Sequence, residues 1–279
     1  MIPDSIPKAL LAALFLGLSL PITGRHLILG RSILLGLAVP QISMAGIAFL
    51  FLGSALGWSW TTHFADDSAR AAAGALLFAV PTLLFLSAIQ RAGRHLSEAW
   101  LAVAYLASFA AANLMLSSNA IGETYLSDLF HGRLILISDE ALRLLAVSLA
   151  ITGAVALALR RRLLLILTDP DFAAVARVRV GGWVMLLALL NGCVIGVSVA
   201  AVGPLVTFGF LVLPALTAAA FARSLRTHLA WSIAAGLIAA AAGYHYAYQW
   251  DFPLGDCTVV CSTVLLILCR AGARVRSLF

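Results

Sequence analysis

The chain has 279 residues, of which 62% are hydrophobic and only 11% charged, and its mean hydropathy is +1.03. A soluble domain of this size carries roughly a quarter charged residues, so the composition excludes a protein surrounded mainly by water. The net charge of +6 does not indicate a nucleic-acid-binding protein either, because the arginines stand at the ends of apolar stretches and no soluble aromatic platform lies between them.

The apolar residues fall into blocks of about 20, the length that an α-helix needs to cross some 30 Å of hydrocarbon. We expect a single all-α integral membrane domain over residues 1–279, a polytopic bundle of about nine transmembrane helices, with eight left open. The expected spans are 9–29, 34–56, 71–89, 99–116, 142–159, 182–200, 205–221, 230–248 and 257–269, the last starting as early as Leu254. Only Val202, Gly203 and Pro204 separate the sixth span from the seventh.

The N-terminal block is as long as a spanning helix and lacks a cleavage pattern, so we expect it to stay in the membrane. The four cysteines lie inside or at the edges of apolar blocks, which favours small packing residues over disulfides or metal ligands. Dense small residues, as in 71–74 and 239–243, predict closely packed helices. Prolines at 21, 40, 81, 204 and 214 predict kinked or broken helices, which suit a transporter better than a passive anchor.

Basic residues predict the orientation of the bundle. Alternating the connections leaves only Lys8, Arg70, Arg133 and Arg143 of the 18 basic residues on one side. The other side receives Arg25, Arg31, Arg91, Arg94, Arg160, Arg161, Arg162, Arg177, Arg179, Arg223, Arg226, Arg270, Arg274 and Arg276. Because basic loops resist translocation, the arginine-rich side is predicted to be cytoplasmic, with the C-terminus inside and, if all nine spans cross, the N-terminus outside.

The opposite face is predicted to be acidic, an electronegative mouth or simply a solvated loop surface. Its longest connection is an outer loop over residues 117–143, for which we expect a short interfacial helix around 125–132 that ends at Gly132. The candidate residues of the outer mouth are Glu123, Asp128, His131 and Asp251.

Two stretches on the arginine-rich side could meet a soluble partner. In the first, Asp169 can cap a short helix that starts at Pro170 and runs to about Val178. The second, residues 214–229, leaves the membrane at a basic cluster and returns at once, so Arg223 and Arg226 could meet acidic residues of a partner. A plain basic turn is the alternative for this second stretch.

Polar residues within the spans are few, and they are candidates for a translocation pathway or for hydrogen bonds between helices. They are Gln41, Ser43, Asn113, Asn191 and His245. The motifs HExxH and GxSxG, a Walker A loop and paired intramembrane aspartates are all missing from the sequence, so an integral membrane enzyme ranks last and no catalytic residue or cofactor is expected.

With these residues in view, the chain resembles the permeases of bacterial ABC importers for zinc, manganese and iron. The similarity lies in order and spacing over nearly the full length. It is clearest in Val202-Gly-Pro-Leu-Val-Thr-Phe-Gly-Phe-Leu-Val-Leu-Pro-Ala-Leu-Thr-Ala218 and Asp251-Phe-Pro-Leu-Gly255, and extends to Asp169-Pro-Asp-Phe-Ala173 and Asp128-Leu-Phe-His-Gly132.

The resemblance implies a type II importer-like fold in the bacterial cytoplasmic membrane and a homodimer around a central pathway. It also implies a separate cytoplasmic ATPase and a solute-binding protein outside the membrane. Residues 214–229 would form the coupling helix that meets the ATPase. The residues expected at that contact are Thr217, Phe221, Arg223, Ser224 and Arg226.

One departure concerns the cargo. Many members carry an Asp and a His near the start of the second span, where this chain has Leu37 and Gln41. An amide is a poorer ligand for zinc than imidazole or carboxylate, so the metal ligands remain unknown and metal selectivity could rest with the binding protein. We predict a permease for a divalent transition metal, with a non-metal cargo or a stand-alone secondary transporter as alternatives.

Overall fold

The computed structural model describes residues 5–29, 33–61, 64, 66–91, 98–118, 137–168, 172–173 and 180–276. Within these ranges every regular element is helical. Helices suit a bilayer because each helix satisfies its own backbone hydrogen bonds where water is absent.

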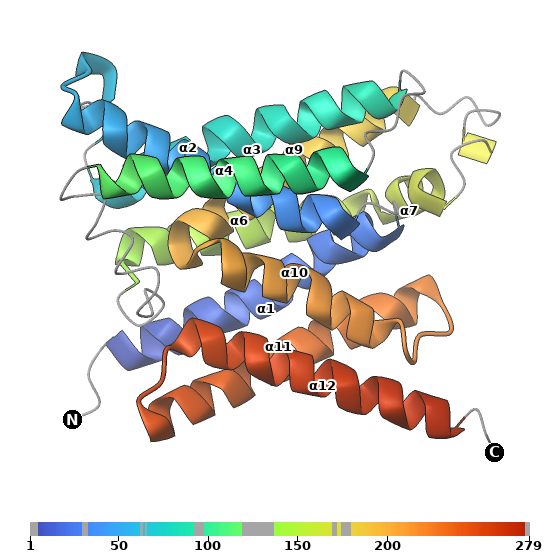
Figure 1. The fold of residues 1–279 in the computed structure, drawn as a ribbon. Helices are drawn as coiled ribbons and strands as arrows, with labels where there is room; N and C mark the ends of the chain where they lie inside the picture. Colours follow the sequence, from blue (N-terminus) through green and yellow to red (C-terminus); the bar gives the residue numbers. More distant parts are fainter. Residues whose placement is uncertain are drawn as a thin grey trace.

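The helices run roughly side by side (Figure 1). In chain order they are α1 (Ser5–Leu29), α2 (Ile33–Ala55), the short 3-10 helix η1 (Ser59–Thr61), α3 (Asp67–Arg91), α4 (Glu98–Ser117), α6 (Asp139–Ala158), α7 (Arg160–Thr168), α9 (Val180–Val202), α10 (Pro204–Ala218), α11 (Leu225–Trp250) and α12 (Leu254–Arg276). The N-terminus lies at one end of the bundle and the C-terminus at the other (Figure 1).

Seven of the helices described are long and apolar enough to cross a membrane, namely α1, α2, α3, α4, α9, α11 and α12. The prediction of a polytopic bundle is therefore confirmed. Helix α10 has only 15 residues, which span about 22 Å. Helix α6 has 20 residues, but Asp139, Glu140 and Arg143 stand near its start. Nine full crossings therefore stay a prediction.

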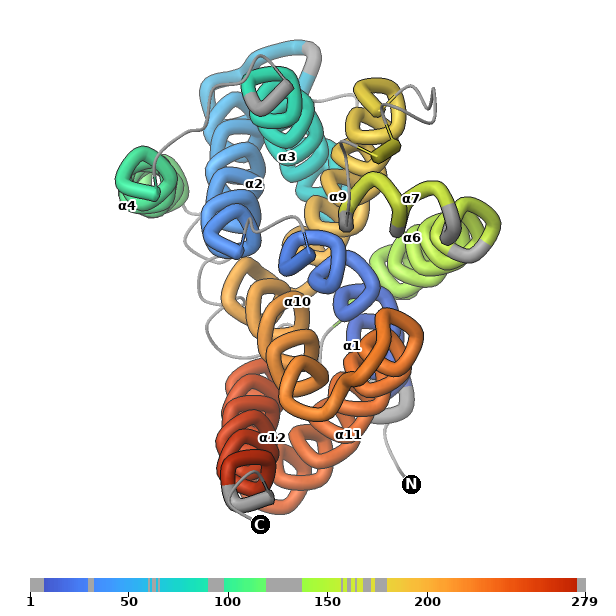
Figure 2. The backbone as a smooth tube through the Cα atoms, turned by 90° about the vertical axis from the view of Figure 1, so that its right-hand side faces the viewer, coloured from blue at the N-terminus to red at the C-terminus, as the bar shows by residue number. Residues whose placement is uncertain are grey.

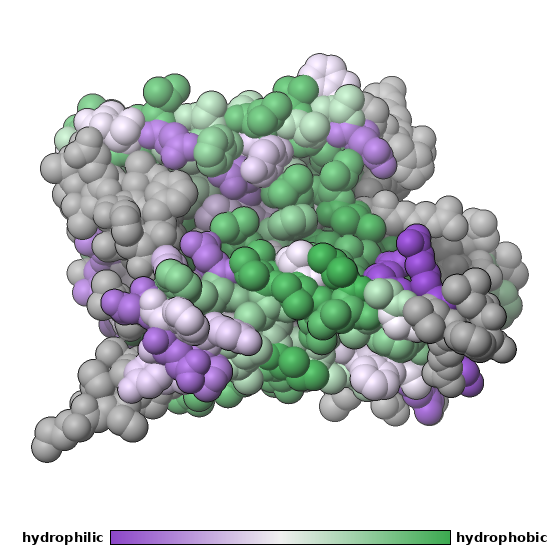
Figure 3. Space-filling view, turned by 60° about the horizontal axis from the view of Figure 1, so that its bottom comes forward, coloured by the Kyte–Doolittle hydropathy of each residue, from purple (hydrophilic) through white to green (hydrophobic). Residues whose placement is uncertain are grey.

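Viewed along the helices, α1 and α10 lie between two groups (Figure 2). On one side α3 packs against α2 and α9, and α4 lies on α2 at the edge of the molecule. On the other side α12 packs against α11, and both of these helices also contact α10. Figure 3 shows an apolar band across the middle of one face, with hydrophilic residues towards both ends of the helices, as lipid on all sides would require.

Glycines sit where helices cross most closely. A Cβ added to Gly74 of α3 would lie 2.6 Å from the Gly46 carbonyl oxygen of α2, and a Cβ on Gly243 of α11 would lie 2.5 Å from the Thr258 Cα of α12. Both glycines belong to the small-residue stretches from which close packing was predicted, and the structure confirms that packing.

The prolines break fewer helices than predicted. Four of them, Pro21, Pro40, Pro81 and Pro214, lie inside continuous helices, because a proline removes only one backbone donor from the helix. The real break comes between α9 and α10 at Gly203, whose φ of 83° lies in the region that favours glycine. Pro204 then stands at the start of α10, where a missing N–H costs nothing.

Candidate functional site

The turn between α10 and α11 is built from short, well-defined hydrogen bonds. The carbonyl oxygens of Ala215, Thr217 and Ala218 accept the amides of residues 219–222. Ser224 then caps α11, its side chain accepting from the Thr227 amide while the Thr227 hydroxyl oxygen accepts from the Ser224 amide. The chain thus reverses within six residues, 219–224.

These bonds change the prediction for residues 214–229. Residues 214–229 form no separate helix. They comprise the last turn of α10, the reversal and the first turn of α11, because the capping residue Ser224 starts a new helix almost at once. Of the residues expected to meet an ATPase, Arg223, Ser224 and Arg226 are exposed at the tip. Thr217 is 4% exposed and its hydroxyl bonds the Leu213 carbonyl, while the Phe221 ring packs on Trp231 at 5.9 Å.

This reversal, which we call the basic turn (residues 219–224), lies at the same end of the bundle as the last turns of α12. A groove of about 680 Å³ is lined by Ala219 and Ala220 on one side and by Leu266, Ile267, Arg270 and Arg274 among others on the other. The basic turn and the end of α12 therefore share one end of the molecule, as the distribution of arginines predicts (Figure 1).

One arginine counted with the cytoplasmic side is buried among the helices instead. Arg25 lies within α1 with 4% of its surface exposed, and its guanidinium donates a hydrogen bond of 3.3 Å to the carbonyl of Leu225, the first residue of α11. The sequence analysis missed this residue because the charge pattern placed it at the end of a span. The signal was available, since Arg25 and His26 stand four and three residues before the end of an expected span, at Leu29.

The candidate pathway residues do not form one cluster. Gln41 and Ser43 are buried on α2, and Asn191 is buried on α9, where it faces His26 of α1. Asn113 is half-buried on α4 and its amide donates to the Phe109 carbonyl of its own helix. His245 is exposed on α11 beside Tyr246, so it points away from the interior of this single chain.

A metal site is not evident within the described ranges, where no three His, Cys, Asp or Glu side chains come close enough to hold an ion. Leu37 and Gln41 both lie on α2, one turn apart, and Gln41 is 6% exposed. Asn191 Oδ1 and His26 Nδ1 have no hydrogen-bond partner in the part of the chain that is described. These two atoms show that the region between α1 and α9 is polar inside the bundle.

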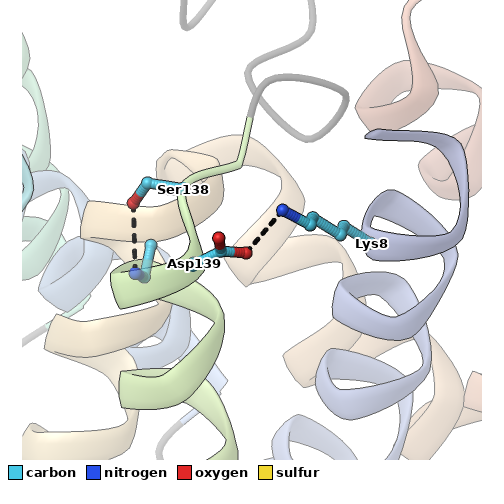
Figure 4. A network of polar contacts seen from close by, with 4 residues as sticks. Lys8, Ser138 and Asp139 are labelled. Atoms are coloured by element: carbon cyan, nitrogen blue, oxygen red, sulfur yellow. Dashed lines mark hydrogen bonds and ion pairs between the residues drawn. The ribbon is translucent and has the colours of Figure 1, made fainter. Parts of the chain in front are cut away.

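The opposite end carries acidic groups. A pocket of about 430 Å³ is lined by Asp66, Asp67 and Glu140, and the Ser68 hydroxyl donates to Glu140 Oε2 at 3.2 Å. Beside it Lys8 and Asp139 form an ion pair of 2.6 Å, and Ser138 caps α6 (Figure 4). The hydrogen bond and charge of Lys8 lower the pKa of Asp139.

Of the residues predicted for the outer mouth, only Asp251 lies in the described part of the chain. Asp251 is exposed and ends α11 in a left-handed conformation with φ of 52°, its amide bonding the Ala247 carbonyl. Glu123, Asp128 and His131, with the interfacial helix expected around 125–132, lie outside the described residues, as does most of the helix expected after Asp169.

A bundle of long apolar helices, with a basic turn at one end and an acidic pocket at the other, is the architecture of a multi-pass membrane protein. More particularly, the chain belongs to the ABC 3 transport family, whose model matches residues 3–272. The predicted family is thereby confirmed, and its relatives described below are permease subunits of transport systems.

Individual relatives agree. The chain is 25% identical over 264 residues to the manganese import system permease protein ScaB of Streptococcus parasanguinis, covering 94% of this chain and 89% of that protein. It is 28% identical over 100 residues to the high-affinity zinc uptake system membrane protein ZnuB of Haemophilus influenzae, covering 36% and 38%. The solved structure of PsaBC from Streptococcus pneumoniae in complex with Fab has the same fold, with a TM-score of 0.77, 19% identity and coverage of 95% and 91%.

Proposed function

We propose that this chain is the membrane-spanning subunit of a bacterial ABC importer for a divalent transition metal, manganese or zinc. The observation that carries the proposal is the similarity to a manganese import permease along 94% of the chain. Alternating access would be driven by ATP hydrolysis in a separate subunit.

The two ends of the bundle support two different partners. The exposed Arg223 on the basic turn and Arg226 in the first turn of α11 suit the acidic surface of a cytoplasmic ATPase. The acidic pocket around Asp66, Asp67 and Glu140 suits basic residues of a solute-binding protein on the other side. This arrangement supports a location in the bacterial inner membrane, with the C-terminus in the cytoplasm.

A homodimer would place the pathway between two copies of the chain. Large apolar side chains exposed on α4 and α12 are compatible with a contact to a second copy as well as to lipid, and they include Leu106, Leu114, Val260 and Leu268. His245 is exposed on a single chain and would then face a pathway between the two subunits. Gln41 and Ser43 are buried, so they would lie inside one subunit rather than at that surface.

The cargo can be tested directly by reconstituting the chain with its ATPase and binding protein in proteoliposomes. We expect ATP-dependent uptake of radiolabelled manganese or zinc, and no uptake when the ATPase carries a substitution that stops hydrolysis. Uptake that continues without any ATPase would instead show a secondary transporter, which would need an ion-coupling acid in the membrane.

A second candidate is a permease for a non-metal or chelated cargo, favoured by the two positions at Leu37 and Gln41 that lack metal-binding side chains. In the same proteoliposomes, ATP hydrolysis stimulated by the loaded binding protein, but without uptake of manganese or zinc, would support this second candidate and overturn the first.

A further inference from the structure

The basic turn is tied to α1 by a buried positive charge. The η1 nitrogen of Arg25 donates a hydrogen bond of 3.3 Å to the carbonyl of Leu225, which lies 200 residues further along the chain. Leu225 follows directly after the turn. The side chain of Arg25 is therefore the link between the end of α1 and the segment that carries Arg223 and Arg226.

The burial of Arg25 is costly. A guanidinium stays charged at any physiological pH, and moving it out of water costs free energy unless it is paired. Yet within the described ranges the ion pairs are Lys8 with Asp139 and Arg70 with Asp67, neither of which involves Arg25. Arg25 Nε also has no hydrogen-bond partner there. A buried charge with no carboxylate partner among the described residues points to a role beyond stability.

A second link lies directly beside the first. His228, on the first turn of α11 and 9% exposed, lies close to Arg25 and to the backbone of Ala215 near the end of α10, and its Nδ1 lies 3.4 Å from the Ser232 hydroxyl. Ala215 also accepts the Ala219 amide at the start of the turn. Helices α1, α10 and α11 thus meet just behind the turn.

Close backbone packing keeps α1 from sliding past its neighbours. A Cβ on Gly24, the residue before Arg25, would overlap the carbonyl oxygen of Leu211 in α10. Earlier in α1, a Cβ on Gly17 would lie 2.8 Å from the Gly236 carbonyl oxygen of α11. No side chain lies between these backbones that could shift to absorb a movement. A displacement of α10 or α11 must therefore carry α1 with it.

We propose that Arg25 is a positioning residue that fastens the basic turn to α1, so that force applied to Arg223 and Arg226 moves α1, α10 and α11 as one unit. The source of that force, a partner ATPase, rests on the proposed function; the fastening itself does not. Arg25 would act through the turn and would touch neither the cargo nor ATP.

The first test measures the fastening in the purified chain. The native cysteines at 193, 257, 261 and 269 are replaced, and a spin label is attached at Ala219→Cys, an exposed position on the turn. We expect Arg25→Met to increase the mobility of the label and Arg25→Lys, which keeps the charge and a donor, to stay closer to wild type. Ser19→Ala is the matched control, because Ser19 is also buried on α1 but bonds only Phe15 of its own helix.

The second test measures coupling in the complete complex with its ATPase and binding protein, as manganese transported per ATP hydrolysed. A residue that acts along a coupling network shifts coupling by roughly 2- to 30-fold, so we expect a loss in this range for Arg25→Met, a smaller loss for Arg25→Lys and none for Ser19→Ala. Loss of protein stability alone would lower the amount of complex but not this ratio.

Wild-type label mobility and a wild-type transport ratio in Arg25→Met would overturn the proposal. If Arg25→Met does not yield folded protein, Arg25→Gln, which is shorter and uncharged, takes its place, and wild-type values in it would overturn the proposal equally. If the wild-type complex moves no manganese, the proposed cargo is wrong, while the label on the isolated chain still decides whether Arg25 fastens the turn.

Discussion

Two exposed arginines, Arg223 and Arg226, supply the charge of the turn between α10 and α11. Ser224, which stands between them, caps α11 with its side chain. Less of its hydrogen-bonding capacity is therefore available to a partner. The charges of the two arginines therefore provide the most direct way to test the ATPase contact at the level of single residues.

We expect Arg223→Glu combined with Arg226→Glu to lower ATP-driven uptake by roughly tenfold or more, because reversing two charges replaces attraction to an acidic partner by repulsion. The double variant should still insert and purify, since both side chains are exposed. Uptake in proteoliposomes and co-purification of the ATPase measure the effect.

The control is Arg143→Glu, a single reversal on an exposed arginine near the start of α6, at the acidic end of the bundle, compared with Arg223→Glu and Arg226→Glu each made alone. Unchanged uptake in the double variant, with the ATPase still bound, would show that the turn is not the coupling contact. A loss of equal size in the control would show that net charge, rather than the turn, decides.

At the scale of helices, the crossing of α1 and α10 at Gly24 decides how closely these elements can pack. We expect Gly24→Ala to destabilise the protein by about 1–3 kcal/mol, since the added methyl would overlap the Leu211 backbone and the helices would have to separate. Thermal unfolding in detergent, followed by the loss of the monodisperse peak on gel filtration, measures the change.

Gly153→Ala in α6 is the control for this substitution, because a Cβ at that position meets nothing within 4 Å among the residues that the structure describes. Alanine also favours a helix over glycine, so the control should be neutral or slightly stabilising. Equal melting temperatures for the two variants would contradict the close approach of α1 and α10.

At the scale of the whole molecule, all the proposed contacts require the same orientation of the chain in the membrane. We expect single cysteines at Ala219 and Ala273, in a background without the native cysteines, to react with a membrane-impermeant maleimide only in inside-out vesicles. A cysteine at Ser68, beside the acidic pocket, should react only in right-side-out vesicles. Labelling of positions 219 and 273 from opposite sides would rule out the arrangement of the bundle.

Most of the helices could be predicted from the sequence, because lipid requires long apolar segments and these are visible without any tertiary contact. The expected span 34–56 differs from α2 by one residue at each end, and 99–116 likewise differs from α4 by one. The break at Gly203 and Pro204 was also visible, since glycine and proline act through local backbone geometry.

Tertiary structure alone decided what lies inside the bundle. Arg25 carries a charge that sequence patterns assign to the cytoplasmic end of a span, and only the packing of α1 against α10 and α11 shows that it is buried beside Leu225. Conversely, His245 sits within an apolar span yet is exposed in the single chain. Hydropathy records whether a segment enters the membrane, whereas the direction of a side chain depends on which helices surround it, and that is a property of contacts between residues far apart in the sequence.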